Sequence, residues 1–422
     1  MKNSLSKNSH RIKEVNKLKD CRVCGGTSLL TFLQLGPTPA PNGFLDKMQL
    51  NNSEKFYPLD VCFCESCGMV QLAHVVSPKV MFSNYVYIPS TSVTMQGHFN
   101  KLSIDAIKRT NAERGNLVVD IGSNDGTLLK FFKESEMQIL GVDPAVNLAD
   151  KANKEEIETI CDLFTRDLAK RIRKEKGEAK IITATNVFAH APDLHDFVEG
   201  VKALLSDDGL FIIEFPYLID LLEKVEFDTI YQEHLSYIAL TPLNKLLEKH
   251  GMYLIDAKRI PVHGGSIRVY VSKVNKASSQ KFKSLIKLEK KKGILNRETY
   301  LKFRKRVDNI RHDLVQLLWS LRLKDKKIVG YGASAKGNVT LNYCRIGPET
   351  LDYIVDSISY KQGKFTPGMH IQIHPEKKLL EDQPDYTLIL AWNFADEIIN
   401  KQEEYRKKGG KFILMLPEVR IV

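Results

Sequence analysis

Two pairs of cysteines near the start of the chain could bind a metal ion. They lie in Cys21-x-x-Cys24-Gly25 and Cys64-x-x-Cys67-Gly68, and the two-residue spacing lets both sulfurs of a pair face one ion. Four thiolates close tetrahedrally on Zn²⁺ and leave no open coordination position, so we expect a structural zinc site. Buried free thiols are the alternative. Cys62 is a fifth thiol, but its spacing to Cys64 fits such a pair poorly.

A glycine-rich loop and an acidic residue form a second candidate site. The pattern Asp120-x-Gly122-x-x-x-Gly126 follows an apolar stretch and opens a helical one, and it resembles motif I of class I methyltransferases. Gly122 lets the backbone approach a ligand, and Gly126 lets the helix pack closely. Asp143 stands 21 residues beyond Gly122, at the end of the next apolar stretch, where a carboxylate can accept both hydroxyls of a ribose.

These features predict an S-adenosylmethionine site. NAD is the alternative, because it binds to the same architecture. However, the loop is not Gly-x-Gly-x-x-Gly, and its polar centre suits a sulfonium amino acid better than a pyrophosphate. The residues expected around the cofactor are Asp120, Gly122, Ser123, Asn124, Asp125, Gly126, Asp143 and Asn186.

Polar segments after two further apolar stretches carry groups for acid–base chemistry. In an open α/β sheet the carboxyl ends of the strands face the ligand, which places Asn186 near the cofactor and His190 near the acceptor. Further on, Tyr231, Glu233 and His234 offer a hydrogen-bond donor, an orienting carboxylate and a base. A structural histidine at a domain junction is the alternative for His234. The hydroxyl-rich segment that contains Tyr85 could contact a sugar.

The elements that must position these residues alternate between strand and helix, which indicates a parallel, doubly wound sheet. A helix and two late strands then suit the antiparallel pair that ends a methyltransferase sheet. A Lys-rich helical stretch leads to a second, smaller α/β unit. The expected strands fall at residues 117–121, 139–142, 181–185, 210–215, 253–260, 266–271, 328–331, 353–355, 386–390 and 411–415.

Length and composition indicate a soluble protein of several domains. The net charge of +11 comes largely from the first 19 residues and residues 281–327. A frayed tail with solvated helix faces would account for it, and an anionic partner such as nucleic acid, a phosphorylated metabolite or a membrane surface is the alternative. No apolar run approaches the roughly 18 residues that span a membrane, and we expect a cytoplasmic monomer. The expected parts are a disordered basic tail (1–20), a zinc-binding module (21–80), a methyltransferase domain (81–273), a helical connector (274–325) and a Rossmann-like substrate domain (326–422).

Taken together and in this order, the motifs resemble the bacterial sugar C-methyltransferases that act on nucleotide-linked 4-keto-6-deoxyhexoses. The likeness extends to residues 263–268 and to the loop at residues 330–338. It implies a class I methyltransferase Rossmann-like core between a zinc module and a C-terminal Rossmann-like α/β domain. It also implies His234 as the base, with Tyr231, Glu233, His190 and Tyr85 around the sugar. The candidate substrate-binding residues are His263, Arg268, Ser334, Lys336 and Asn338.

The chemistry that the resemblance implies is methyl transfer to carbon. The C4 ketone acidifies the proton on C3, a base removes it, donors hold the enolate oxygen, and the carbanion attacks the sulfonium methyl in line. No nucleic acid or membrane partner is expected. A zinc-containing nucleic-acid methyltransferase and a non-catalytic binding protein are the alternatives. The Lys-rich stretch has little aromatic interleaving, and Tyr231, Glu233 and His234 are all present, which disfavours both.

Overall fold

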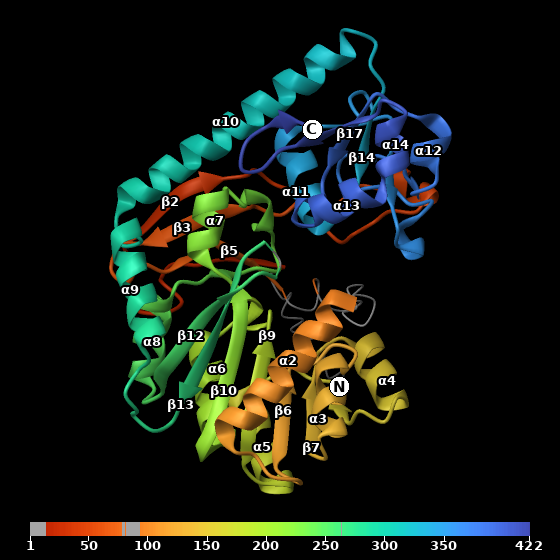
Figure 1. Cartoon of the computed structure of the whole chain (residues 1–422). Helices are drawn as coiled ribbons and strands as arrows, with labels where there is room; N and C mark the ends of the chain where they lie inside the picture. Colours follow the sequence, from red (N-terminus) through yellow and green to blue (C-terminus); the bar gives the residue numbers. More distant parts are fainter. Residues whose placement is uncertain (1–13, 78–80, 82–92, 263) are drawn as a thin grey trace, which may run out of the picture.

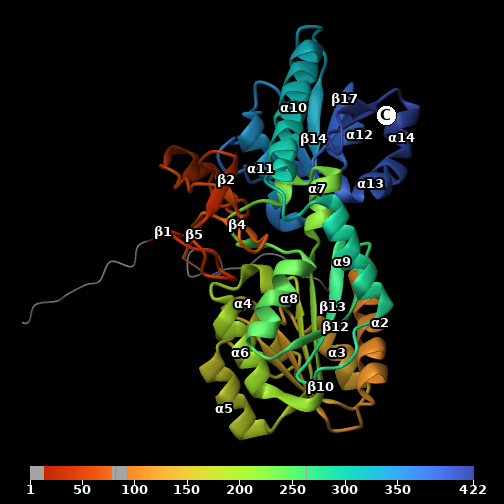
Figure 2. The same ribbon diagram turned by 90° about the vertical axis from the view of Figure 1, so that its left-hand side faces the viewer.

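Three packed parts make up the protein (Figure 1, Figure 2). The computed structural model describes residues 14–77, 81, 93–262 and 264–422. A lower lobe surrounds a seven-stranded sheet, an upper lobe surrounds a six-stranded sheet, and a small sheet lies beside their junction. We name these parts the core domain (93–272), the C-terminal domain (328–422) and the cysteine module (14–77).

The sheet of the core domain has the strand order β12-β13-β10-β9-β6-β7-β8. Strands β6 to β10 pair in parallel, whereas β13 pairs antiparallel with both β10 and β12, so the expected late antiparallel pair is confirmed. The strands are β6 (Leu117–Ile121), β7 (Gln138–Val142), β8 (Thr159–Ile160), β9 (Ala179–Thr185), β10 (Leu205–Pro216), β12 (Tyr253–Ile260) and β13 (Ser266–Ser272).

Helices cover both faces of this sheet, which is why its central strands are almost continuously apolar. On β6, Val118 packs in a cluster with α2 and α3, whereas its neighbour Val119 packs in a second cluster with α5 and α6. No helix in the described part of the chain has the length and apolar character needed to cross a membrane. The helices are α2 (Val93–Thr110), α3 (Thr127–Glu134), α4 (Val146–Lys154), α5 (Arg166–Lys176), η3 (Phe188–His190), α6 (Leu194–Leu204), α7 (Leu218–Lys224), η4 (Phe227–Thr229) and α8 (Leu240–Lys249).

The cysteine module shares its sheet with the core domain. The order is β11-β4-β3-β2, and β11 (Ser236–Tyr237) belongs to the core domain. The expectation of a disordered tail at residues 1–20 is wrong for its described part, because β1 finds backbone partners on β5 and pairs with it. The module's own strands are β1 (Val15–Lys17), β2 (Leu29–Gln34), β3 (Asp60–Cys64), β4 (Val70–Leu72) and β5 (His74–Val76), with a short helix η1 (Lys47–Asn51).

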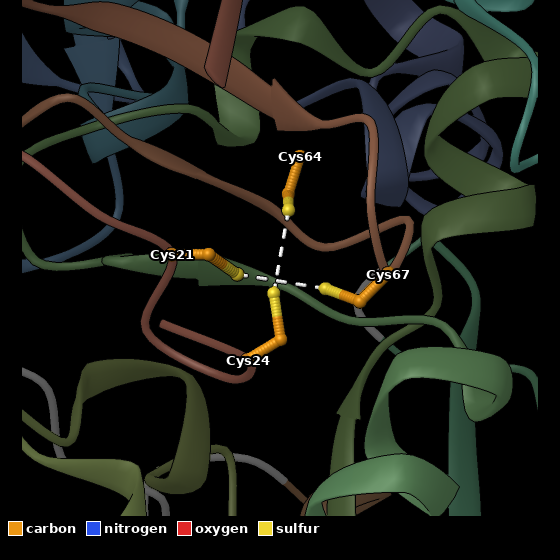
Figure 3. A group of neighbouring side chains, drawn as sticks. All are labelled: Cys21, Cys24, Cys64 and Cys67. Carbon is orange, nitrogen blue, oxygen red and sulfur yellow. Dashed lines mark hydrogen bonds between the residues drawn. The ribbon is translucent and has the colours of Figure 1, made fainter. Parts of the chain in front are cut away.

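The four paired cysteines come together in the cysteine module (Figure 3). Their sulfur atoms all lie within 4.8 Å of one another, with 3.5 Å between Cys21 and Cys67 and 3.6 Å between Cys24 and Cys64. A tetrahedral zinc ion with Zn–S distances of about 2.3 Å requires sulfur–sulfur distances of about 3.8 Å. The arrangement therefore fits the ion. Cys62 lies outside the cluster, with its sulfur 3.3 Å from the hydroxyl of Thr31.

The C-terminal domain has a six-stranded sheet in the order β16-β15-β14-β17-β18-β19, parallel except for β19. Its strands are β14 (Ile328–Tyr331), β15 (Ile354–Asp356), β16 (Ile373–Pro375), β17 (Tyr386–Ile389), β18 (Lys411–Leu414) and β19 (Arg420–Ile421). Its helices are α11 (Ala335–Cys344), η5 (Ser359–Lys361), α12 (Lys378–Asp382), η6 (Trp392–Phe394), α13 (Ala395–Lys401) and α14 (Glu403–Lys407).

Two helices, α9 (Gln280–Lys292) and α10 (Arg297–Arg322), lie between the core domain and the C-terminal domain along the chain. Near the start of α10, the ring of Tyr300 stacks on Phe63 of the cysteine module with 4.3 Å between centroids. Farther along, Asp308 accepts a hydrogen bond of 3.0 Å from Tyr343 of α11. Both parts are thereby attached to one helix, which runs along the upper lobe (Figure 2).

Loss of the metal is expected to unfold the cysteine module, because metal binding supplies folding free energy to small zinc sites. Purified protein should hold about one zinc ion per chain, and Cys64→Ser should lose the ion and expose the module to proteolysis. Cys62→Ser is the matched control, since this thiol is on the same strand but outside the cluster. Metal-free protein with an intact module would contradict the assignment.

Candidate active site

A cavity of about 330 Å³ lies where the carboxyl ends of the core strands face the C-terminal domain. The loops after β6, β7 and β9 line it, as the sheet architecture predicts. One side chain of the C-terminal domain, Lys336, also lines it. The candidate residues that line the cavity are Asp120, Gly122, Ser123, Asn124, Asp143, Asn186, His190, Tyr231, His234 and Lys336.

The glycine-rich loop has a backbone that other residues would strain. Gly122 has φ of 68°, and a Cβ atom there would lie 2.1 Å from the side chain of Val187. Gly126 precedes α3 with φ of 75°, and a Cβ atom there would lie 2.7 Å from Ile157. Both positions therefore require glycine. Gly122 lies on the cavity, whereas Gly126 is not among its lining residues and allows the close packing of α3 against Ile157.

Asp143 is fixed in place at the end of β7. One carboxylate oxygen accepts from the amide of Asn124 and the other from the amide of Ala145, each at 2.9 Å. Each carboxylate oxygen has a further lone pair that can accept from a ribose hydroxyl. Burial raises the pKa of Asp143, while these amides favour its ionised form. The adjacent Asp120 accepts from Thr183 at 2.6 Å, and burial raises its pKa to about 7.

Two buried polar atoms on the cavity point to a polar ligand. The hydroxyl of Ser123 and the amide oxygen of Asn186 have no hydrogen-bond partner among the described residues. Buried polar atoms are rarely left unsatisfied, so a ligand that supplies donors fits here. Asp125, also expected at the cofactor, does not line the cavity formed by the described residues. Its carboxylate accepts from Thr127 at 2.6 Å and pairs with Lys151 at 3.2 Å, and its contact with the cofactor stays a prediction.

Three aromatic rings form a stack on the acceptor side of the cavity. The ring centroid of His234 lies 4.0 Å from that of Tyr231 and 4.9 Å from that of His190. Nδ1 of His234 is 2.7 Å from the carbonyl oxygen of Thr229. Because a carbonyl only accepts, this contact places the proton on Nδ1 and makes Nε2 the basic nitrogen. The group that fixes the tautomer is therefore a backbone carbonyl, not Glu233.

His190 is uncharged in this group of rings. Burial lowers its pKa to about 4, so the ring carries no charge at neutral pH. The two residues that follow His190 are hydrogen-bonded to the cysteine module. Arg22, which lies between the first two cysteines, donates to the carbonyls of Ala191 and Pro192. The cysteine module thus contacts the turn that carries His190.

Glu233 is buried and faces the cysteine module instead of lining the cavity. Its Oε1 accepts a hydrogen bond of 2.9 Å from the amide of Asn42. Asn42 lies 191 positions away, in the long segment between the two cysteine pairs. No feature of the sequence singled out Asn42 or the carbonyl of Thr229. The predicted contacts of Tyr85 and His263 lie outside the described residues.

Lys336 lies at the start of α11 within a cluster of charged and aromatic side chains. Its ammonium is 4.4 Å from the ring centroid of Trp392, whose indole donates to Asp228 at 2.6 Å. Burial raises the pKa of Glu226 to about 7 and that of Asp228 to about 6, and Lys336 opposes both shifts. Burial lowers the pKa of Lys336, and the two carboxyls oppose that shift. Charge attraction thus connects the core and C-terminal domains at the cavity.

Three other predicted substrate contacts have partners within the protein, and their role toward a substrate stays a prediction. Arg268 is buried within the sheet, where it pairs with Glu214 on the neighbouring strand. Asn338 is buried and donates to the carbonyl of Pro41 at 2.7 Å. Ser334 caps α11 by accepting from the amide of Gly337 at 3.0 Å. None of the three lines the cavity formed by the described residues.

A known protein and three family models match most of the chain. C-methyltransferase NovU from Streptomyces niveus is 37% identical over 414 residues, which cover 97% of this chain and 98% of NovU. Family models match three successive segments: a zinc binding domain at residues 21–82, a methyltransferase domain at residues 95–257, and a C-methyltransferase C-terminal domain at residues 261–417.

Solved structures also resemble part of the chain. Magnesium protoporphyrin IX methyltransferase from Synechocystis PCC 6803, solved with bound SAM, is 12% identical with a TM-score of 0.33 and covers 44% of this chain and 85% of its own. The PH0226 protein from Pyrococcus horikoshii OT3 is 17% identical with a TM-score of 0.36 and covers 44% of this chain and 94% of its own. Both likenesses involve less than half of the chain.

Removal of the Asp143 carboxylate is expected to weaken binding of S-adenosylmethionine. A hydrogen bond to a charged group contributes about 1.5–3 kcal/mol, so Asp143→Ala should lower the affinity roughly tenfold to a hundredfold in calorimetry. Asp150→Ala, an exposed aspartate on α4, is the control and should leave the affinity unchanged. Equal affinity in both variants would exclude Asp143 as the ribose acceptor.

The free energy of unfolding should fall as pH rises from about 4.5 to 7, because of Glu226. Its folded pKa of about 7 exceeds the ordinary 4.5, so in this range the unfolded chain ionises before the folded one. The shift corresponds to about 3 kcal/mol. Glu226→Gln should remove this part of the decline in denaturant titrations at several pH values. Glu134→Gln, at an exposed site on α3, should keep it.

Proposed function

Because the chain belongs to the C-methyltransferase family, we propose that it methylates C3 of a nucleotide-linked 4-keto-6-deoxy sugar. Its class I methyltransferase fold, its dependence on S-adenosylmethionine and its zinc site are those expected from the sequence. The observation that carries the proposal is the arrangement of the His234 ring. Its Nδ1 is hydrogen-bonded to the carbonyl of Thr229, and Tyr231 lies beside it on the cavity. A base and a hydroxyl donor side by side are what enolate formation needs.

The proposed reaction begins at the C3 proton, which the adjacent ketone acidifies. Nε2 of His234 accepts this proton, and the imidazolium that forms keeps its hydrogen bond to Thr229. The hydroxyl of Tyr231 donates to the enolate oxygen, a contribution of about 2.7–4 kcal/mol for a well-placed donor. When bound, S-adenosylmethionine supplies the electrophilic methyl group to this carbon.

The His190 ring beside His234 does not oppose this proton transfer. A charged neighbour would raise the free energy of the His234 imidazolium, because two like charges would lie close together in a buried site. His190 is uncharged at neutral pH, since burial lowers its pKa to about 4. It therefore packs against the base without electrostatic repulsion.

The C-terminal domain is suited to the nucleotide part of the substrate. Lys336 presents a cation to the cavity at the start of α11, where the helix dipole also favours an anion such as a diphosphate. Asp356, the residue of this loop that would bind the ribose of NAD, accepts from the amides of Ala333 and Ile358 at 2.8 Å each and also pairs with Lys361 at 3.4 Å. We expect Lys336→Met to raise the KM for the sugar nucleotide.

Loss of the proposed base should abolish C3 deprotonation. His234→Asn should lower kcat by about 10²–10⁴-fold with unchanged cofactor affinity. With S-adenosylhomocysteine in place of the cofactor, wild-type enzyme in deuterated water should label C3 of a nucleotide-linked 4-keto sugar, as read by mass spectrometry. His234→Asn should lose this exchange, and His312→Asn, at an exposed position on α10, should retain it.

Two outcomes would count against the mechanism. Exchange at the wild-type rate in His234→Asn would move the base to another residue, with His190 or Tyr231 next. Absence of both labelling and methylation in the wild-type enzyme, across a panel of nucleotide-linked 4-keto sugars, would reject the proposed substrate class.

A further inference from the structure

The segment between the two cysteine pairs touches all three parts of the protein. We call this segment, residues 25–63, the knuckle-linking segment. On the C-terminal domain, Leu45 exchanges both backbone hydrogen bonds with Phe365, and Glu54 accepts from the amide of Gly368 and contacts His370 at 2.8 Å. The segment is thus fixed to the C-terminal domain at two points.

Before residue 45, the knuckle-linking segment contacts the turn that carries the proposed base His234, on the side away from the cavity. Gln232 donates to the hydroxyl of Thr38 at 2.7 Å. The amide of Asn42 donates to Oε1 of Glu233 at 2.9 Å. Glu233 and Gln232 are 4% and 1% exposed. These hydrogen bonds are therefore shielded from water, where the low dielectric strengthens each bond and makes its loss costly.

The C-terminal domain in turn fixes Asn42. Asn338 on α11 is 1% exposed, and its amide donates to the carbonyl of Pro41, the residue before Asn42, at 2.7 Å. A continuous chain of contacts therefore runs from α11 through Pro41 and Asn42 to Glu233. His234 is the next residue, and its own amide donates to Tyr231 within the same tight turn.

We propose that Asn42 is a positioning residue that holds Glu233, and with it the turn that carries His234, in the arrangement needed for proton abstraction. Asn338 sets the position of Asn42 from the C-terminal domain. This inference deepens the function proposed above and rests on it for its kinetic arm. The hydrogen bond itself can be tested without any substrate.

Substitution by the isosteric aspartate separates hydrogen bonding from packing. Asn42→Asp keeps the shape of the side chain but places a second carboxyl against Glu233. In assays above the pKa values of both carboxyls, this pair is worse than no partner because like charges repel. Asn42→Ala only removes the donor. If Asn42 acts through its amide, kcat should fall about tenfold in Asn42→Ala and further in Asn42→Asp. Cofactor affinity and zinc content should stay unchanged in both variants.

Hydrogen–deuterium exchange of residues 231–235 gives the readout that needs no substrate. Exchange should accelerate in Asn42→Asp and return toward the wild-type rate in Asn42→Asp with Glu233→Gln, where the direction of the hydrogen bond is reversed. Asn338→Ala should accelerate exchange in residues 38–44 and, more weakly, in residues 231–235. Asn52→Asp, at an exposed asparagine of the same segment, is the matched control and should change nothing.

The two arms separate failure of this inference from failure of the proposed function. Wild-type exchange in residues 231–235 of Asn42→Asp would overturn the positioning role, whatever the substrate. Equal kcat for Asn42→Asp and the wild-type enzyme would overturn it as well. If the wild-type enzyme methylates no keto sugar but exchange responds as expected, the substrate proposal fails and the positioning contact stands.

Discussion

A two-residue strand that crosses a domain boundary holds the proposed catalytic turn. Strand β11 follows directly after residues 231–235 and adds to the edge of the cysteine module's sheet, with Ser236 opposite Gln71 and Tyr237 opposite Val70. A strand this short has little stability of its own, so its position depends on the sheet that it joins. That sheet is too small to be stable without a staple. The cysteine cluster is thereby connected to the proposed catalytic turn from outside the cavity, through β4 and through Arg22.

The parts of the fold that the sequence predicts are those that local pattern determines. The core strands could be found because burial on both faces makes them apolar, as Val118 and Val119 illustrate. The cysteine pairs and the glycine loop carry fixed spacing because their chemistry demands it. In contrast, strand β1 was missed because it is polar and gains its order from pairing with β5.

Side-chain direction is what the sequence could not supply. Asp125 and Arg268 occur in motifs that were expected to surround a ligand, and each pairs with a side chain of opposite charge: Lys151 in one case and Glu214 in the other. Glu214 is directly opposite Arg268 on paired strands, a relation visible only once the register is known. Asn42 meets Glu233 across 191 positions. Contacts of this kind depend on how whole domains pack.

The cysteine module is fastened to the C-terminal domain twice, through α10 and through the knuckle-linking segment. Tyr300 and Tyr343 mark the first attachment, and Glu54 with His370 marks the second. One attachment would allow the two parts to rotate relative to each other, whereas two separate attachments fix their orientation. The core domain is joined to the same module, because β11 pairs with β4 and Arg22 donates to the carbonyls of Ala191 and Pro192. The cysteine module therefore holds both walls of the cavity, the wall that carries His234 and the wall that carries Lys336, in one fixed arrangement.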